Sequence, residues 1–449
     1  MGTSIKYFKK ILLAIYLIIL GLLIAFDRSA AGLTIFNIRI GEILIFGFLV
    51  VCFILFLQVQ NIKYFSFFSD FILSIRIVNI LVIFFLVSLV VFSSDFFNPY
   101  VFRTSSYIWT IGAFFVSLYL FKDIKKYHKL SKLAAILLLF LPPIHYLFST
   151  GFYPNFVMDI FIKYSDKFTF PKASDIMLSL VIINLLNFKI FNNKKFNLFY
   201  LISSVSIMLP LLLLMSRGSF LSLGVFVLLF LFSERKFVFR NLIYCSIIFV
   251  LGYILFTLST YNVNDIEFNQ EISVQELSIT ENIKEIAKKK ETRKAFLSFY
   301  FQDGRIMSID NTTNWRLDIW QDVIEDLNNK NQFLLGYGYN EIIPVMLDPS
   351  APGRLGRDGL NENVHNYLIN VLARGGFFVA LLIVYFHYSY IKIWYKKFKN
   401  YEILLFFIPA IINSLLDITM EGVQFPVLYY SFVGILFNLE NKRKQKEFF

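Results

Sequence analysis

The sequence predicts an all-α polytopic membrane protein with about twelve transmembrane helices and one long periplasmic loop that carries short amphipathic helices. Composition is the first observation that predicts this class. Of the 449 residues, 57% are hydrophobic and 55 are Phe, and the mean hydropathy is +0.63. A soluble domain of this length has no core large enough for so much apolar surface. The second observation is that apolar runs close to bilayer length recur along the chain.

The apolar runs each predict one helix across the hydrocarbon core. They lie at 11–26, 40–57, 75–92, 107–121, 132–149, 175–191, 197–215, 218–233, 240–258, 376–394, 402–418 and 423–438. The first run is followed by Asp27-Arg28-Ser29 and lacks an Ala-x-Ala-like cleavage site, so we interpret it as a retained anchor. Cys52 and Cys245 lie in different runs, which favours small core residues over a disulfide or a metal clamp.

Lys and Arg predict the orientation of the helices. They precede the first run and enrich alternate connections, at 122–132, 189–195, 235–240, 392–399 and in the tail at 441–446. The positive-inside bias assigns these segments, and with them both termini, to the cytoplasm. The connections at 93–106, 150–174, 259–375 and 417–422 are then external. The net charge of +12 follows from this bias, so it does not indicate a nucleic-acid partner.

The spacing of the runs divides the chain into three parts. Residues 1–258 form an N-terminal transmembrane block of about nine helices, and residues 376–449 form a C-terminal block of about three helices with a basic tail. The long periplasmic loop between them, 259–375, holds the polar motifs. Near its start, Ser278-x-x-Glu281 resembles a capping box before a solvated helix.

The middle of the loop predicts a second short helix, from Asn314 to Leu327. Its apolar residues recur at helical spacing and are Leu317, Trp320, Ile324 and Leu327. We expect this helix to lie on the membrane surface with its tryptophans at headgroup depth. Gly336-Tyr-Gly338 then predicts a turn, and the Pro/Gly-rich segment 348–359 predicts an irregular loop.

Three candidate functional residues stand on the predicted outer side. Arg217 lies between two strongly apolar runs. An arginine in such a place either has a functional role or extends its side chain to the membrane–water interface, and its charge alone does not decide between these two interpretations. Arg316 begins the 314–327 helix and by itself favours pairing with Asp318 or with lipid headgroups. His365 follows Asn363, which we expect to cap the next helix. A neutral imidazole at such a position is suited to act as a general base.

Several chemistries lack their motifs in this sequence. There is no Asp-x-Asp pair, no His-Glu-x-x-His and no Cys/His cluster, so no metal ligands are predicted. A Gly-x-x-x-x-Gly-Lys-Ser/Thr loop and a Gly-x-Ser-x-Gly elbow are also absent. The remaining candidate residues on the predicted outer side are cationic. They are Arg217, Arg316 and, as further candidates, Arg305, Arg354, Arg357 and Arg374.

These residues carry a resemblance to a known family. Ser216-Arg-Gly-Ser at a span end, Trp315-Arg-Leu-Asp-Ile-Trp and Leu335-Gly-Tyr-Gly in the loop, and Val364-His-Asn-Tyr-Leu near its end are similar to the O-antigen polymerase and ligase superfamily. The resemblance covers roughly residues 200–435. It implies a metal-independent, inverting glycosyltransferase without cofactors, which acts on sugars linked to undecaprenyl pyrophosphate at the periplasmic side of the bacterial inner membrane.

The family's roles carry over to the matching residues. Arg217 and Arg316 would hold the pyrophosphate, since a planar guanidinium binds phosphate oxygens in pairs and stays ionised. His365 would accept the proton of the incoming sugar hydroxyl, with Glu362 as an alternative base. Further substrate-binding candidates are Asn366, Tyr337, Arg305, Arg374 and Glu362.

The resemblance leaves the acceptor open. A polymerase passes the glycan to another lipid-linked repeat unit, whereas a ligase passes it to a lipid A core or a protein. Val379 stands where ligases more often have Gly, Thr or Tyr, which favours the polymerase. Expected partners are the lipid-linked donor and acceptor, membrane lipid and, as a further candidate, a chain-length regulator. A flippase or other transporter ranks below both enzymes, because Arg76 is the only clear charge well inside a span.

Overall fold

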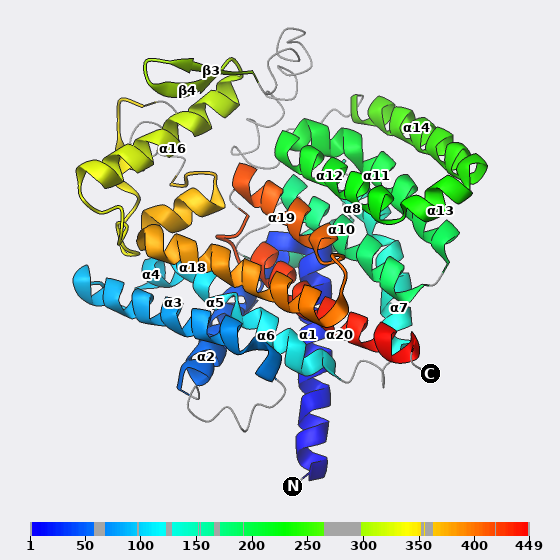
Figure 1. The fold of residues 1–449 in the computed structure, drawn as a ribbon, viewed down its shortest axis with the longest axis horizontal. Helices are drawn as coiled ribbons and strands as arrows, with labels where there is room; N and C mark the ends of the chain where they lie inside the picture. Colours follow the sequence, from blue (N-terminus) through cyan, green and yellow to red (C-terminus); the bar gives the residue numbers. More distant parts are fainter. Residues whose placement is uncertain are drawn as a thin grey trace.

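The computed structural model describes residues 2–57, 68–96, 98–122, 128–150, 152, 154–165, 171–191, 193–264, 298–351, 354, 362–417 and 419–447. Within these ranges the chain is predominantly helical, and Figure 1 shows the helices gathered into one bundle with a smaller group of elements at one end. The predicted helix at Ser278 lies outside the described residues.

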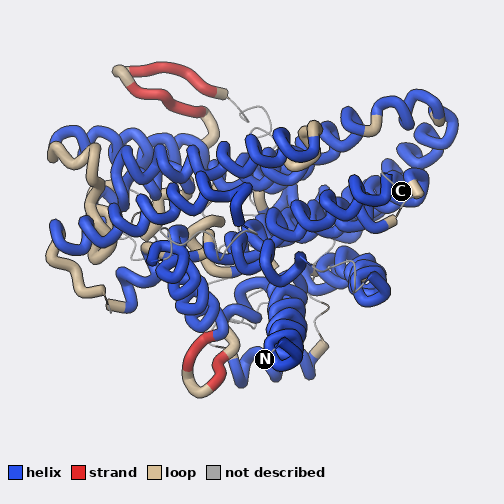
Figure 2. Tube along the Cα trace, turned by 60° about the horizontal axis from the view of Figure 1, so that its bottom comes forward, coloured by secondary structure: helices blue, strands red, loops and turns tan. Residues whose placement is uncertain are grey.

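The elements of the N-terminal half are α1 (Gly2–Ala31), β1 (Thr34–Ile35), β2 (Ile38–Arg39), α2 (Ile40–Leu57), α3 (Ile72–Val91), α4 (Pro99–Thr104), α5 (Ser106–Trp109), α6 (Gly112–Leu120), α7 (His128–Leu139), α8 (Leu141–Ser149), α9 (Asn155–Tyr164), α10 (Ala173–Ile190), α11 (Lys194–Met215), α12 (Arg217–Ser233), α13 (Arg235–Arg240) and α14 (Leu242–Asn264). The remaining elements are β3 (Phe299–Gln302), β4 (Arg305–Ser308), α16 (Asn311–Asn329), the 3₁₀ turn η4 (Pro344–Leu347), α18 (Tyr367–Phe398), α19 (Leu404–Leu416) and α20 (Gln424–Glu447). The two short antiparallel hairpins, β1–β2 and β3–β4, project from the helical body (Figure 2).

Eight helices within the described residues are long and apolar enough to cross a membrane. Three of the other predicted spans correspond to shorter apolar helices at Ser106–Leu120, Arg217–Ser233 and Leu404–Leu416, and the last lies within α20. The protein is therefore a multi-pass membrane protein built from helices, and the number twelve stays a prediction. Cys52 and Cys245 are buried and free, as expected.

Two hydrophobic cores hold the molecule together. The larger core runs through the apolar helices, with α11 against α14, α6 against α20, α12 against α19 and α3 against α18. The smaller core joins α16 and η4 to the start of α18, and its fully buried members include Ile319, Val323 and Leu327.

The helix predicted at 314–327 is confirmed as α16, and two of its predicted apolar residues pack as expected, because Leu327 is fully buried and Trp320 packs on the smaller core. The rest of the predicted apolar face differs. Ile324 is 37% exposed, whereas Ile319 and Val323 are completely buried. The buried stripe faces the smaller core, because α16 packs on η4 and α18. Trp320 accordingly donates its indole hydrogen to the Val364 carbonyl oxygen at 2.6 Å. That the helix lies on the membrane surface stays a prediction.

A break in α18 joins the two cores. Gly376 has a φ of 74°, a left-handed conformation that interrupts the helix, and the Phe377 N–H donates to Phe333 O at 2.9 Å instead of to Ala373 O. The Gly336-Tyr-Gly338 turn fills this break, since the Tyr337 N–H donates to Ala373 O at 2.7 Å and the Gly338 N–H donates to Arg374 O at 3.1 Å. The predicted turn therefore contacts α18 at its break and connects α18 to the smaller core.

Opposite this end, a buried ionic cluster ties three helices together. The Lys189 ammonium, at the end of α10, lies 2.5 Å from the Glu440 carboxylate of α20 and also contacts Glu402 just before α19. Lys189 and Glu440 are each 3% exposed. The cluster lies at the helix ends that the positive-inside bias assigns to the cytoplasm.

Candidate active site

The C-terminal end of α19 collects polar side chains from distant parts of the chain. The last carbonyls of a helix have no intrahelical partner, and they carry partial negative charge. Here the Arg316 Nη1 donates to Leu416 O at 2.5 Å, and the Asn366 Nδ2 donates to Leu415 O at 2.9 Å. The end of α19 therefore fixes Arg316 of α16 and the start of α18 at one place.

His365 lies at this same place. Its backbone is left-handed, with φ 52°, and its Nδ1 lies 3.8 Å from Asp417 Oδ1, directly after α19. The imidazole ring packs 5.3 Å from the Trp315 ring, centroid to centroid, and its side chain is 23% exposed. An imidazole beside a carboxylate, with access to solvent, can accept and release a proton.

Asn366 caps α18, because its side chain accepts from the Ile369 N–H at 3.1 Å. The expectation that Asn363 performs this function is wrong. The helix begins three residues later than predicted, since Asn366 has the extended backbone that a cap requires. His365 is consequently the residue before the cap.

Arg217 is the first residue of α12, behind the capping residue Ser216. Its Nη1 lies 2.9 Å from Asp310 Oδ1, and Asp310 in turn caps α16 by accepting from the Thr313 N–H at 3.0 Å. Burial raises the pKa of Asp310, but the hydrogen bonds from Thr313 and the charge of Arg217 outweigh it and hold that pKa below its usual value. Arg217 therefore positions α16 as well as contributing its own charge.

Arg316 is a half-buried cation at the centre of these contacts. Desolvation lowers the pKa of its guanidinium, while Asp417 and Asp310 oppose this shift. Its Nε is buried and has no hydrogen-bond partner among the described residues, and no carboxylate of the described chain lies within ion-pair distance. A guanidinium with a carbonyl on one side and unused donors on the other is suited to bind an anion.

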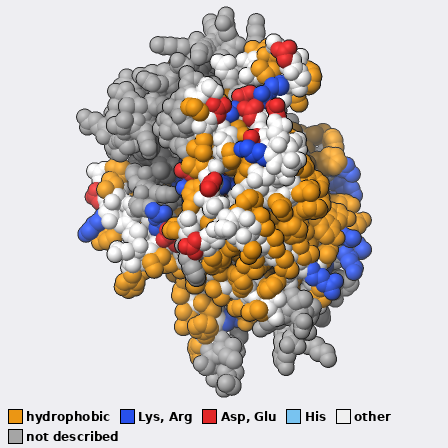
Figure 3. All heavy atoms as spheres, turned by 90° about the vertical axis from the view of Figure 1, so that its left-hand side faces the viewer, with side chains coloured by type: hydrophobic (Ala, Val, Ile, Leu, Met, Phe, Trp, Pro, Cys, Tyr) orange, Lys and Arg blue, Asp and Glu red, His pale blue; other side chains and the backbone are white. Residues whose placement is uncertain are grey.

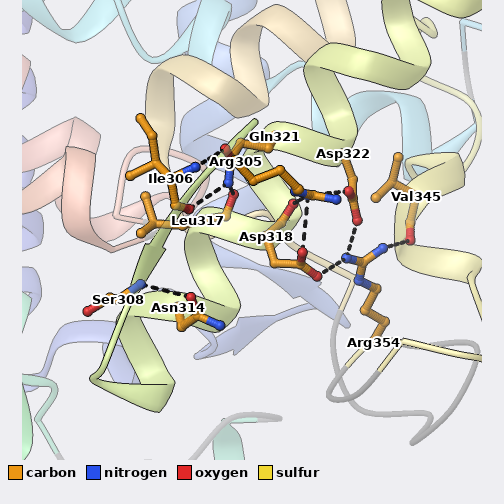
Figure 4. Close-up of polar contacts among 10 residues, drawn as sticks. All are labelled: Arg305, Ile306, Ser308, Asn314, Leu317, Asp318, Gln321, Asp322, Val345 and Arg354. Carbon is orange, nitrogen blue, oxygen red and sulfur yellow. Dashed lines mark hydrogen bonds and ion pairs between the residues drawn. The ribbon is translucent and has the colours of Figure 1, made fainter. Parts of the chain in front are cut away.

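Other predicted binding residues lie in a separate network on α16 (Figure 4). Arg305 contacts Asp322 at 2.5 Å and Asp318 at 3.1 Å, and the buried Arg354 contacts the same carboxylates at 2.5 and 3.0 Å. Arg354 also donates to Val345 O at 3.1 Å, so the network links β4, α16 and the turn η4. These charges neutralise one another and organise the loop.

The aromatic candidate Tyr337 is likewise engaged within the loop, away from the end of α19. Its hydroxyl donates to Asp326 Oδ2 at 2.7 Å. Burial, followed by this hydrogen bond to a carboxylate, raises the pKa of Tyr337 above its usual value. The phenol therefore stays protonated and acts as a donor to Asp326.

Arg374 and Glu362 lie on another side of the site. Arg374 is buried and donates to Glu341 O and to the Tyr100 hydroxyl, the latter at 3.2 Å, while Glu362 lies 3.6 Å from Arg103. Glu421, in the connection between α19 and α20, is close to these charges. Burial raises the pKa of Glu421 to about 7, with Arg374 and Arg103 opposing the shift.

The residues that sequence reasoning missed are acidic. Asp310, Asp417 and Glu421 were not selected, although Asp417 and Glu421 flank the short connection between the last two apolar runs. Carboxylates at an external helix end beside predicted arginines are the signal that marks them. Among the described residues, no group of three His, Cys, Asp or Glu side chains could hold a metal ion.

Acidic and basic side chains gather on the face that carries α16, whereas apolar side chains cover much of the rest of that view (Figure 3). The fold and the site thus define a multi-pass membrane protein with an arginine and histidine site where its apolar helices meet the segment that carries α16. A sequence model of the family described as O-antigen ligase matches residues 177–384. This match supports the resemblance to the O-antigen ligase and polymerase superfamily, whose members are glycosyltransferase-like enzymes that use lipid-linked glycans.

The matched segment contains Arg217, Arg316 and His365 but ends within α18, before Asp417. No curated protein matches the chain.

Proposed function

We propose that the protein is a surface-polysaccharide polymerase of the O-antigen type. It transfers a growing glycan from undecaprenyl pyrophosphate to the non-reducing end of another lipid-linked repeat unit, at the periplasmic face of the bacterial inner membrane. The observation that carries the proposal is the pairing of Arg316, a half-buried cation whose Nε has no hydrogen-bond partner among the described residues, with the His365–Asp417 pair at the end of α19.

In this mechanism Arg316 and Arg217 bind the pyrophosphate of the donor and stabilise the charge that develops as its glycosidic bond breaks. His365 accepts the proton of the attacking hydroxyl, and Asp417 orients the imidazole and stabilises its protonated form. Attack opposite the leaving group inverts the anomeric carbon, as in other inverting sugar transfers. The arginines supply positive charge at the leaving group, so the reaction is proposed to need no metal ion or cofactor.

The test is elongation by the purified full-length protein in nanodiscs, supplied only with lipid pyrophosphate repeat units. A polymerase yields longer lipid-linked chains, and excess EDTA leaves the rate unchanged. No product until a lipid A core is added would identify a ligase. Accumulation of substrate across a sealed membrane, without any new glycosidic bond, would identify a transporter.

His365→Ala tests the proton transfer. Elongation should be lost while binding of undecaprenyl pyrophosphate is kept, because the arginines hold the lipid. His365→Gln serves as the matched variant, since a residue that only packs or donates a hydrogen bond tolerates this change. Elongation by His365→Ala at the wild-type rate would remove the imidazole from the mechanism and point to a carboxylate such as Asp417 or Glu362.

The proposed membrane orientation has its own test. A cysteine introduced at Asp303 should react with an impermeant thiol reagent in intact spheroplasts, and one at Lys236 should react only after lysis. The opposite pattern would place the site in the cytoplasm.

A further inference from the structure

The four residues of the Ser216-Arg-Gly-Ser219 motif each make a different contact. Ser216 caps α12 by accepting from the Ser219 N–H at 3.3 Å, and Arg217 pairs with Asp310. Gly218 and Ser219 instead face α19, which lies beside α12 (Figure 1). Two of the four residues therefore serve a contact between helices, at the turn that carries Arg217.

Gly218 packs directly against the last residue of α19. A Cβ added at Gly218 would stand 2.9 Å from the Leu416 Cβ and 3.5 Å from its Cδ1. The next nearest atom, the Ser216 Oγ, would be 3.7 Å away. A separation of 2.9 Å between two carbon atoms is an overlap, so a side chain here would push the first turn of α12 away from α19. The absence of a side chain lets the two helix ends meet.

A buried hydrogen bond joins the same two helices within one turn of Leu416. The Asn413 amide of α19 donates through Nδ2 to the Ser219 Oγ at 2.8 Å, and both side chains are completely buried. The Asn413 Oδ1 has no hydrogen-bond partner among the described residues. A buried amide that leaves its oxygen unpaired costs free energy, which an apolar residue would avoid. The bond to Ser219 specifies where α12 lies along α19, and apolar packing alone does so less strictly.

Three contacts connect α12, α16 and α19 in a closed ring. Arg217 of α12 pairs with Asp310, which caps α16. Arg316 of α16 donates to the Leu416 carbonyl oxygen of α19, and Leu416 packs against Gly218 of α12. Two contacts alone would let one helix turn relative to the others, whereas the third contact fixes all three. The ring therefore fixes the separation of the two arginines.

Close packing of small residues also occurs between membrane helices that have no functional role. Packing of that kind can lie anywhere along a helix. Here it lies beside Arg217, and its partner Leu416 is the residue that holds Arg316. The two interpretations differ in whether the effect of a substitution at Gly218 depends on both arginines.

We infer that Gly218 and Asn413 are positioning residues, which hold the Arg217 and Arg316 guanidinium groups at the separation at which both contact one pyrophosphate. The inference rests on the proposed function, in which these arginines bind the donor. The two phosphoryl groups of a pyrophosphate share one bridging oxygen, so the anion spans a short, fixed length. Moving one arginine away from the other therefore removes one charge-assisted contact and leaves the other in place.

The first experiment measures the affinity of full-length protein in nanodiscs for undecaprenyl pyrophosphate by isothermal titration calorimetry. Gly218→Ala should weaken binding by about tenfold, the effect of losing one charge-assisted contact. Adding Leu416→Gly removes the overlapping Cβ and keeps the carbonyl that holds Arg316, so this double variant should recover the affinity. Gly224→Ala on the same helix is the control, since a Cβ there meets nothing within 4 Å. Wild-type affinity in Gly218→Ala would overturn the inference.

A double-variant cycle separates positioning from general stability. In the Arg217→Ala/Asp310→Asn background only Arg316 remains, so Gly218→Ala should change the affinity by less than about twofold. Equal losses in both backgrounds would show that Gly218→Ala acts through the stability of the fold alone, which contradicts the inference. Asn413→Leu keeps the size of the side chain and removes the hydrogen bond, so it should follow the same pattern. It supplies the test if Gly218→Ala does not fold.

The outcomes also separate this inference from the proposed function. Coupling to Arg217 in the binding cycle, without any elongation from lipid pyrophosphate repeat units, would reject the polymerase and keep the paired arginines. Normal elongation with equal losses in both backgrounds would reject the inference alone. A wild type that binds no undecaprenyl pyrophosphate would reject both.

Discussion

Arg217 and Asp310 are 93 positions apart, yet their side chains meet at 2.9 Å and join the first turn of α12 to the first turn of α16. This ion pair couples the apolar helix α12 to the segment that carries α16. Under the proposed function Arg217 has two separable contributions, one to the docking of α16 and one to substrate binding.

These two contributions predict different outcomes for matched variants. Arg217→Ala leaves Asp310 without its cation and should lower both thermal stability and activity, the latter roughly a hundredfold. Adding Asp310→Asn, which keeps a capping side chain, should restore the melting temperature but not the activity. Recovery of both in the double variant would mean that Arg217 acts only in docking.

Arg217→Lys tests the geometry of the charge. A lysine keeps the positive charge but loses the planar pair of donors, so elongation should still fall strongly while the protein inserts normally. Equal kcat and KM for the lysine variant and the wild type would show that a point charge suffices. Kinetics with purified protein, normalised to the folded fraction, makes the comparison.

The break at Gly376 predicts a large effect from one methyl group. A Cβ at Gly376 would overlap the Leu334 carbonyl oxygen, and the residue needs a left-handed backbone, so Gly376→Ala should cost about 3 kcal/mol or more. Gly224→Ala is the matched control, since a Cβ there meets nothing within 4 Å. Equal melting temperatures for the two variants would mean that the turn is not docked at the break.

The Lys189 cluster predicts a loss of stability far from the site. Lys189→Met buries the Glu440 and Glu402 carboxylates beside each other without their cation, which should destabilise the protein by roughly 3–5 kcal/mol. Lys189→Met/Glu402→Gln/Glu440→Gln removes the unpaired charges and should recover most of this loss. Activity per folded molecule should stay at the wild-type value in both, and a selective loss of activity would contradict a structural role.

Glu421 predicts a pH dependence of stability. Its pKa is raised from 4.5 to about 7, so the folded protein holds a proton that the unfolded chain releases at lower pH. The resulting stabilisation is complete below the unfolded pKa and is lost as the pH rises through about 7. Between about pH 6 and about pH 8 the melting temperature of the wild type should fall by roughly 2 °C or more relative to Glu421→Gln. Parallel curves for both proteins would show that Glu421 does not titrate in this range.

Sequence patterns were sufficient for much of the fold, because apolar runs are local features of the sequence. The span predicted at 197–215 lies within α11, and the 314–327 helix lies within α16. Local patterns failed where a helix is interrupted or shared between two cores. The run at 107–121 is divided into α5 and α6, and α18 extends from Tyr367 through the break at Gly376, ahead of the span predicted from 376.

The site was predictable in its residue types but not in its contacts. Arg217, Arg316 and His365 stand out as polar residues beside apolar runs, and the structure brings Arg316 and His365 together at the end of α19. Asp310 lies 93 positions from Arg217, and Asp417 lies 52 positions from His365, so these partners meet only through tertiary packing. No local sequence pattern predicts such contacts. The sequence suggested Arg305 as a binding residue because its partners could not be predicted. Its ion pairs with Asp318 and Asp322 form only when β4 packs on α16.

The position of α19 in the chain has a consequence for biosynthesis. Its last residues, Leu415 and Leu416, provide the carbonyls that hold Asn366 and Arg316, so these earlier segments reach the bilayer before their anchor has been synthesised. A nascent chain that has inserted everything through α18 still lacks the anchor that organises its site. The contacts that fix Arg316 and Asn366 therefore form only after the helix that supplies their carbonyl acceptors has been synthesised.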